Sequence, residues 1–218
     1  MGNMCSSQAE VGGDDSELEA KLRQGLSDYQ KRNANKKKIK TFNTVMMKFP
    51  KVEAGFKACK STFSQYAKGK DNTLNLADFE VCCKAMNFHV TQEMIRKVFN
   101  ASDVDGSRSI DSKEFVLTIC ILYVMEEFPE DSGVTGEVKE AFELVTEAFI
   151  FLDENNDGSV SKSEVMMALN TASTPGSRGI VEKRFAEMDW DQNGNISFKE
   201  FLLGMEAWVG LDDDEDEE

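Results

Sequence analysis

The chain has 218 residues, with 40 Asp and Glu against 25 Lys and Arg, which gives a formal net charge of -15. Proteins that bind nucleic acid need an excess of basic charge to neutralise phosphates, so this balance argues against that class. A hydrophobic fraction of 40% with only 3 Pro argues against a disordered chain. The length allows one large domain or two small ones.

The first six residues, MGNMCS, fit the M-G-x-x-x-[ST] motif for myristoylation at Gly2, and Cys5 is available for palmitoylation. An unmodified start is the alternative. The segment MGNMCSSQAE lacks the apolar stretch of a secretory signal. We therefore expect an intracellular protein, cytoplasmic or peripheral at the cytoplasmic face of a membrane.

A strongly basic segment follows, with twelve Lys or Arg against two acids in residues 21–60 and the cluster KRNANKKKIK at 31–40. One acyl chain holds a protein only marginally at a membrane, and such a cluster would supply a second attachment to anionic lipids. The cluster also fits a solvated helix face, a nuclear-import or nucleic-acid patch, or an intramolecular partner for acidic parts of the chain. We expect residues 1–40 to form a flexible N-terminal segment.

Four later segments repeat one template, in which a polar loop of twelve residues separates two apolar-periodic helices. The loops begin at 67, 103, 153 and 189, and their eighth residues are Leu74, Ile110, Val160 and Ile196. This spacing predicts an all-α fold with two lobes of two loops each, residues 41–130 and 131–211, joined through the turn-forming sequence FPEDSGVTG at 128–136. The apolar run at 116–125 predicts a buried or groove-lining helix, and the acidic residues 212–218 a solvated tail.

The third and fourth loops, 153–164 and 189–200, match the EF-hand calcium pattern D-x-[DN]-x-[DN]-G-x₅-E in full. Ca²⁺ takes about six to eight oxygen ligands, and this spacing supplies them from one short loop. A polar helix–turn–helix without an ion is the alternative for either loop alone. The predicted ligands are Asp153, Asn155, Asp157, the Ser159 carbonyl, Ser161 through water and Glu164 in the third loop, and Asp189, Asp191, Asn193, the Asn195 carbonyl, Ser197 through water and Glu200 in the fourth.

The second loop, 103–114, fills every ligand position but has Arg108 where the third and fourth loops have Gly158 and Gly194. Its four carboxylates favour binding, whereas Arg108 opposes it, so we predict a third and weaker calcium site. The predicted ligands there are Asp103, Asp105, Ser107, the Ser109 carbonyl, Asp111 and Glu114.

The first loop, 67–78, is degenerate, because Ala67 and Gly69 replace the first two acids and Asp78 is shorter than the closing Glu. We do not expect it to bind calcium. Its role should be structural, with Leu74 pairing with Ile110 as Val160 pairs with Ile196.

The stretches at 42–63 (FNTVMMKFPKVEAGFKACKSTF), 149–161 (FIFLDENNDGSVS) and 184–202 (RFAEMDWDQNGNISFKEFL), together with WVG at 208–210 and the acidic tail, resemble a plant subfamily of calmodulin-like EF-hand proteins. The resemblance covers roughly residues 18–218. It implies calcium sensing without enzymatic activity, and it identifies no target.

Two functions remain open from the sequence. A sensor would open an apolar groove for an amphipathic target helix, and Met166, Met167, Met188 and Met205 would either line that groove or fill the core. A buffer would bind calcium without opening. We expect no enzyme, since neither a nucleophile triad nor a P-loop nor zinc spacing is present.

Overall fold

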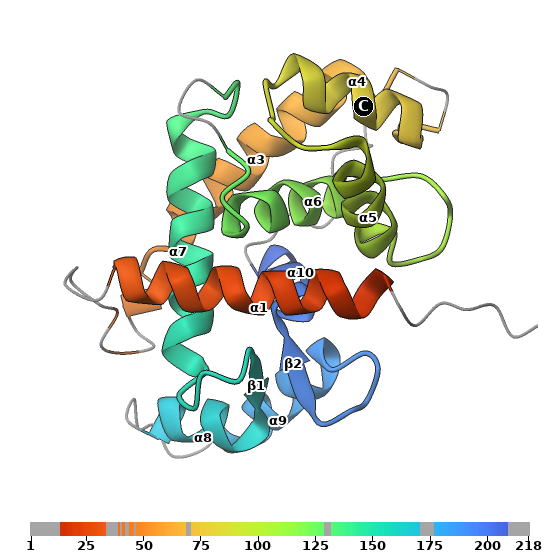
Figure 1. The fold of residues 1–218 in the computed structure, drawn as a ribbon. Coiled ribbons are helices and arrows are strands. Elements are labelled where there is room, and N and C mark those ends of the chain that lie inside the picture. Colours follow the sequence, from red (N-terminus) through yellow and green to blue (C-terminus); the bar gives the residue numbers. More distant parts are fainter. Residues whose placement is uncertain are drawn as a thin grey trace, which may run out of the picture.

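The computed structural model describes residues 14–33, 39, 41, 44–45, 47–68, 71–128, 132–170 and 177–208. This part of the chain is mostly helical, with one small two-stranded sheet, which confirms the predicted all-α fold (Figure 1). The helices are α1 (Asp14–Arg32), α3 (Phe49–Tyr66), α4 (Leu76–Ala85), α5 (Gln92–Ser102), α6 (Ser112–Val124), α7 (Gly136–Leu152), α8 (Lys162–Asn170), α9 (Ser177–Met188) and α10 (Phe198–Trp208), and the strands are β1 (Ser159–Ser161) and β2 (Asn195–Ser197).

The helices form four helix–loop–helix hands, which we number 1 to 4: α3 with α4, α5 with α6, α7 with α8, and α9 with α10. In the C-terminal lobe β1 and β2 pair antiparallel, with Val160 opposite Ile196. In the N-terminal lobe Leu74 and Ile110 form the equivalent bridge, with N–O distances of 2.9 and 2.8 Å between their backbones. Both predicted pairings are confirmed, so hand 1 keeps its structural role.

Side-chain caps define where several helices begin. The Asn75 carboxamide accepts hydrogen bonds from the backbone of Ala77 and Asp78 at the start of α4. Thr91 and Thr135 cap α5 and α7 in the same manner. Each such cap contributes about 1 kcal/mol by satisfying backbone N–H groups that the helix itself cannot pair.

The two lobes share one hydrophobic core, which runs through both pairs of hands. Helix α3 of hand 1 packs along α7 of hand 3, and the rings of Phe56 and Phe142 lie 6.2 Å apart between them. Helix α6 contacts α3, α7 and α10, and every residue from Val116 to Leu122 is buried. The apolar run therefore forms the expected buried helix, at the junction of the lobes.

The structure contradicts the expectation of a flexible segment over residues 1–40 for its described part. Residues 14–32 form helix α1, which Figure 1 shows crossing α7 and running next to α6. Leu18, Leu22, Leu26 and Tyr29 are all buried, at the spacing of one helical face. This apolar stripe could have predicted the helix from the sequence, but the residues around it are charged. Most of the basic cluster at 31–40 lies outside the described residues.

Candidate metal centre

Loops 103–114, 153–164 and 189–200 follow the same backbone path. In each of them the fourth and sixth residues have positive φ: Gly106 and Arg108, Asn156 and Gly158, Gln192 and Gly194. The sixth N–H donates a hydrogen bond to the first Asp in every loop, at 2.9 Å from Arg108 to Asp103, 3.0 Å from Gly158 to Asp153 and 3.1 Å from Gly194 to Asp189. Arg108 therefore leaves the path of the second loop unchanged.

The closing glutamates Glu114, Glu164 and Glu200 are buried and fixed from two sides. Each accepts hydrogen bonds from the N–H groups of the second and ninth loop residues. The N–O distances are 2.8 and 3.0 Å from Val104 and Asp111, 3.0 and 2.8 Å from Glu154 and Ser161, and 3.0 and 2.8 Å from Trp190 and Ser197. In hand 1 the equivalent Asp78 is exposed, which agrees with a loop that does not bind.

The ninth residues Asp111, Ser161 and Ser197 also cap the exit helices α6, α8 and α10. Their side chains accept hydrogen bonds from the backbone N–H of the closing glutamates, at 2.8, 3.3 and 3.2 Å. Together with the backbone N–H groups of these residues that donate to the glutamates, this is a capping box in hands 2, 3 and 4. The same two residues in each loop therefore start the exit helix and present oxygens to the loop interior.

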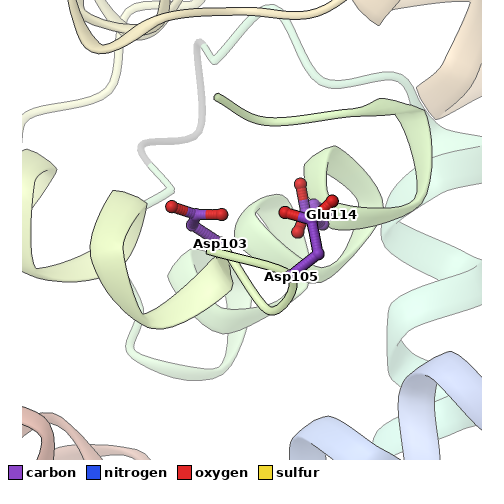
Figure 2. A group of neighbouring side chains, drawn as sticks. All are labelled: Asp103, Asp105 and Glu114. Atoms are coloured by element: carbon purple, nitrogen blue, oxygen red, sulfur yellow. The ribbon is translucent and has the colours of Figure 1, made fainter. Parts of the chain in front are cut away.

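Loops 103–114 and 189–200 bring three acids together. Carboxylate oxygens of Asp103, Asp105 and Glu114 lie within 4.8 Å of one another (Figure 2), as do those of Asp189, Asp191 and Glu200. In both loops one oxygen of the first Asp, Oδ1, is buried without a hydrogen-bond partner. A buried, unpaired carboxylate oxygen is costly, and a hard cation would satisfy it. These donor sets fit Ca²⁺.

Loop 153–164 holds its acids differently. Asp153 Oδ1 accepts from the Asp157 N–H at 3.1 Å, and Asp157 accepts from the Asn155 amide and the Ser159 hydroxyl, each at 2.8 Å. Among the described residues the 4.8 Å grouping of three acids is found in the other two loops and not in this one. To bind Ca²⁺, the predicted ligands of this loop would have to break hydrogen bonds that they now make with one another.

Burial and hydrogen bonding move the pKa values of these acids in opposite directions. Burial raises the pKa of Glu114 and of Asp153, although backbone N–H groups oppose it. For Asp157 and Glu164 burial is outweighed by hydrogen bonds, chiefly from Ser159 and Ser161, and the pKa is lowered. A bound cation would offset the desolvation that raises the pKa of Glu114 and Asp153.

The methionines and the acylation candidates are the remaining predicted residues. Met188 and Met205 are buried in the core, whereas Met167 is 51% exposed. Gly2, Cys5 and the acidic tail lie outside the described residues. Within the described part of the chain, none of the helices has the length and apolar character needed to cross a membrane.

Comparison with known proteins identifies relatives of this chain. A family model for an EF-hand domain pair matches residues 142–206. The chain is 32% identical over 209 residues to the probable calcium-binding protein CML21 of Arabidopsis thaliana, a match that covers 92% of this chain and 88% of that protein. It is 29% identical over 210 residues to the probable calcium-binding protein CML22 of the same plant, covering 92% of each.

A third relative, calcium-dependent protein kinase 21 of Arabidopsis thaliana, is 23% identical over 155 residues, which are only 26% of that kinase. The relatives matched along nearly their whole length are thus calcium-binding proteins and not enzymes. These findings confirm the resemblance noted from the sequence: the chain belongs to the calmodulin-like EF-hand calcium-binding proteins.

Proposed function

We propose that this protein is a calcium sensor with three sites, 103–114, 153–164 and 189–200, which changes conformation to bind an amphipathic helix of a target protein. The observation that carries the proposal is the common geometry of the three loops. In each, a buried closing glutamate is held by the N–H groups of the second and ninth residues.

The position of the closing glutamate links a site to its helices. Ca²⁺ supplies two positive charges and accepts about six to eight oxygens at roughly 2.3–2.6 Å. Glu114, Glu164 and Glu200 lie in the first turns of α6, α8 and α10. A glutamate that moves toward an ion therefore moves its exit helix relative to the preceding helix of the hand, which is how sensor hands open.

The surface available for a target lies inside the closed hands. Helix α6 is buried nearly along its whole length, and Met188 and Met205 are buried in the C-terminal lobe. Opening would expose flexible and aromatic apolar side chains, which adapt well to a partner helix.

Calorimetric titration with calcium tests the number of sites. We expect three sites in the unaltered chain and the loss of one in each of Glu114→Gln, Glu164→Gln and Glu200→Gln, because each variant removes a bidentate charged ligand. Asp78→Asn, at the same loop position in hand 1, is the matched control and should lose none. If Glu114→Gln keeps every site of the unaltered chain, the assignment of 103–114 is wrong.

Fluorescence separates a sensor from a buffer. Trp190 is 45% exposed and its backbone N–H donates to Glu200, while its indole N–H donates to the Glu187 carbonyl, so its emission should report calcium at 189–200. A sensor should also bind an apolar dye when calcium is added, since its core opens. A change in Trp190 emission without dye binding would reject the sensor and leave a buffer.

A further inference from the structure

The exit helices of hands 2 and 4 meet across the boundary between the lobes. Helix α6 contacts α10 directly, and α10 also contacts α7 of hand 3 (Figure 1). Each exit helix carries the closing glutamate of its loop in its first turn, Glu114 in α6 and Glu200 in α10. The two glutamates are therefore attached to helices that lie against each other, although their loops belong to different lobes.

The residue that directly follows each closing glutamate is buried in the shared core. These residues are Phe115 in α6 and Phe201 in α10. The ring of Phe115 lies 5.5 Å from that of Phe63 in α3, and the ring of Phe201 lies 5.5 Å from that of Phe149 in α7. Helices α3 and α7 pack along each other. Because closely packed interiors do not deform continuously, neither exit helix can shift without moving its neighbours.

A buried ion pair holds α10 against the N-terminal lobe. Lys60 of α3 lies 2.8 Å from Glu206 of α10, and the Glu206 side chain is 3% exposed. Separation of such a pair leaves a buried charge without compensation, which is strongly destabilising. Movement of α10 therefore requires a rearrangement of the whole boundary between the lobes.

Loops 103–114 and 189–200 also share one calcium-free geometry. Each brings three acids within 4.8 Å of one another and leaves Oδ1 of its first Asp buried without a hydrogen-bond partner. Within its own lobe, loop 103–114 is bridged to loop 67–78, where Ala67 and Gly69 replace the first two acids. Hand 2 therefore lacks a partner with a complete ligand set in its own lobe, whereas the exit helix that it touches in the other lobe belongs to hand 4.

We propose that hands 2 and 4 form a calcium-binding pair across the lobes, so that an ion bound in loop 103–114 raises the calcium affinity of loop 189–200, and the reverse. The inference rests on the proposed function, in which the exit helices move when calcium binds. This pair is distinct from the pair within the C-terminal lobe, where the strands β1 and β2 join hands 3 and 4.

The closed contact between α6 and α10 determines the sign of the coupling. In the calcium-free structure this contact holds both exit helices in place. The first ion that draws in a closing glutamate must break the contact, and the second ion binds without that cost. The coupling is therefore positive, and by linkage each site strengthens the other by the same factor. Direct repulsion between two bound ions would give the opposite sign.

Trp190 provides a readout of loop 189–200 alone, since its backbone N–H donates to Glu200 at 3.0 Å. The chain has two Trp, so in a Trp208→Phe background the emission comes only from Trp190. Glu114→Gln should raise the calcium concentration at half-maximal emission change by about fivefold or more. Asp78→Asn, at the same loop position in hand 1, is the matched control and should leave this concentration unchanged. An unchanged or lowered value for Glu114→Gln would overturn the pairing.

Variants at the lobe boundary test the route of the coupling. Lys60→Met keeps an apolar side chain but removes the partner of buried Glu206, which weakens the contact of α10 with the N-terminal lobe. In this variant, Glu114→Gln should shift the half-maximal calcium concentration of Trp190 emission less than it does in the chain with Lys60. Lys51→Met is the matched control, since Lys51 pairs with α7 at an exposed position, and the full shift should persist there. A full shift in Lys60→Met, with circular dichroism showing that it is folded, would reject the lobe boundary as the route.

Calorimetry separates this inference from the proposed function. In Glu200→Gln, loop 103–114 should bind calcium more weakly by the same factor that Glu114→Gln imposes on loop 189–200. Three bound ions in the unaltered chain, without an effect of either variant on the other loop, would overturn the pairing and leave the sensor intact. Binding of two ions with none in loop 103–114 would instead reject the third site of the proposed function, and the pairing with it.

Discussion

At the sixth position of loop 103–114, Arg108 adopts a backbone conformation that residues with a side chain disfavour. Arg108 has φ of 65°, a left-handed conformation that costs a residue with a side chain roughly 1–2 kcal/mol. The conformation is retained because its N–H still donates to Asp103 at 2.9 Å. Gly106, two residues earlier, takes the other left-handed position of the loop without strain.

Replacement of Arg108 by glycine should therefore stabilise the calcium-free protein. We expect the free energy of unfolding to rise by about 0.5–1 kcal/mol, since the relief of backbone strain exceeds the entropy that glycine adds to the unfolded chain. Urea denaturation in chelator measures the change. The neighbouring Ser107→Gly, at a residue without positive φ, should lower stability. An Arg108→Gly variant no more stable than Ser107→Gly would show that the loop is not strained at this position.

At the scale of the elements, the contact of α3 with α7 is set by a glycine. A Cβ on Gly55 would lie 2.6 Å from the Glu137 carbonyl oxygen and would also collide with Ala141. Both opposing atoms belong to α7, and the oxygen is backbone, so the helices must separate to admit a larger residue.

Gly55→Ala should consequently destabilise the protein by about 1–3 kcal/mol, although alanine favours a helix by itself. Thermal unfolding followed by circular dichroism provides the measurement. Gly136→Ala, on the other helix of the pair, is the control, because no atom lies within 4 Å of its Cβ position. A stabilised Gly55→Ala variant would mean that α3 and α7 are not in close contact.

Elements local in sequence could be predicted, and contacts between them could not. The loop pattern predicted the four hands, and the eighth loop residues predicted the pairing of Val160 with Ile196. The stripe that contains Phe56 marks a buried face of α3, but an apolar face does not specify its partner, so the contact with α7 was not predictable. Helix α1 was missed because the charges around Leu22 and Leu26 favoured a solvated segment. The partnerless Oδ1 atoms of Asp103 and Asp189 required the folded geometry.

At the scale of the whole molecule, a buried ion pair joins the lobes. Lys60 of α3 lies 2.8 Å from Glu206 of α10, and Glu206 is 2% exposed. Burial raises the pKa of Glu206, opposed by Lys60 and by the charge of Lys113 in hand 2. The carboxyl group of Glu206 in α10 thus interacts with charges on α3 and at the beginning of α6. Its charge state therefore affects the contact between the two lobes.

The raised pKa of Glu206 predicts a pH dependence of stability. Glu206 keeps its proton to a higher pH in the folded state than in the unfolded chain, where its pKa is near 4.5. The contribution of protonated Glu206 to the free energy of unfolding is therefore complete below the unfolded pKa and is lost as the pH rises through the folded pKa. Glu206→Gln has no proton to lose. Consequently, the free energy of unfolding of the unaltered chain, relative to this variant, should fall as the pH is raised from about 4.5 through the folded pKa of Glu206.

Urea denaturation in chelator across this pH range provides the test, since it removes calcium from the comparison. Glu140→Gln is the matched control, because Glu140 pairs with Lys51 across the lobes at an exposed position, where a substitution should change stability by less than about 0.5 kcal/mol. Parallel pH profiles for the unaltered chain and Glu206→Gln would show that this carboxyl group ionises as readily in the fold as in the unfolded chain. The buried pair would then hold the lobes together independently of pH.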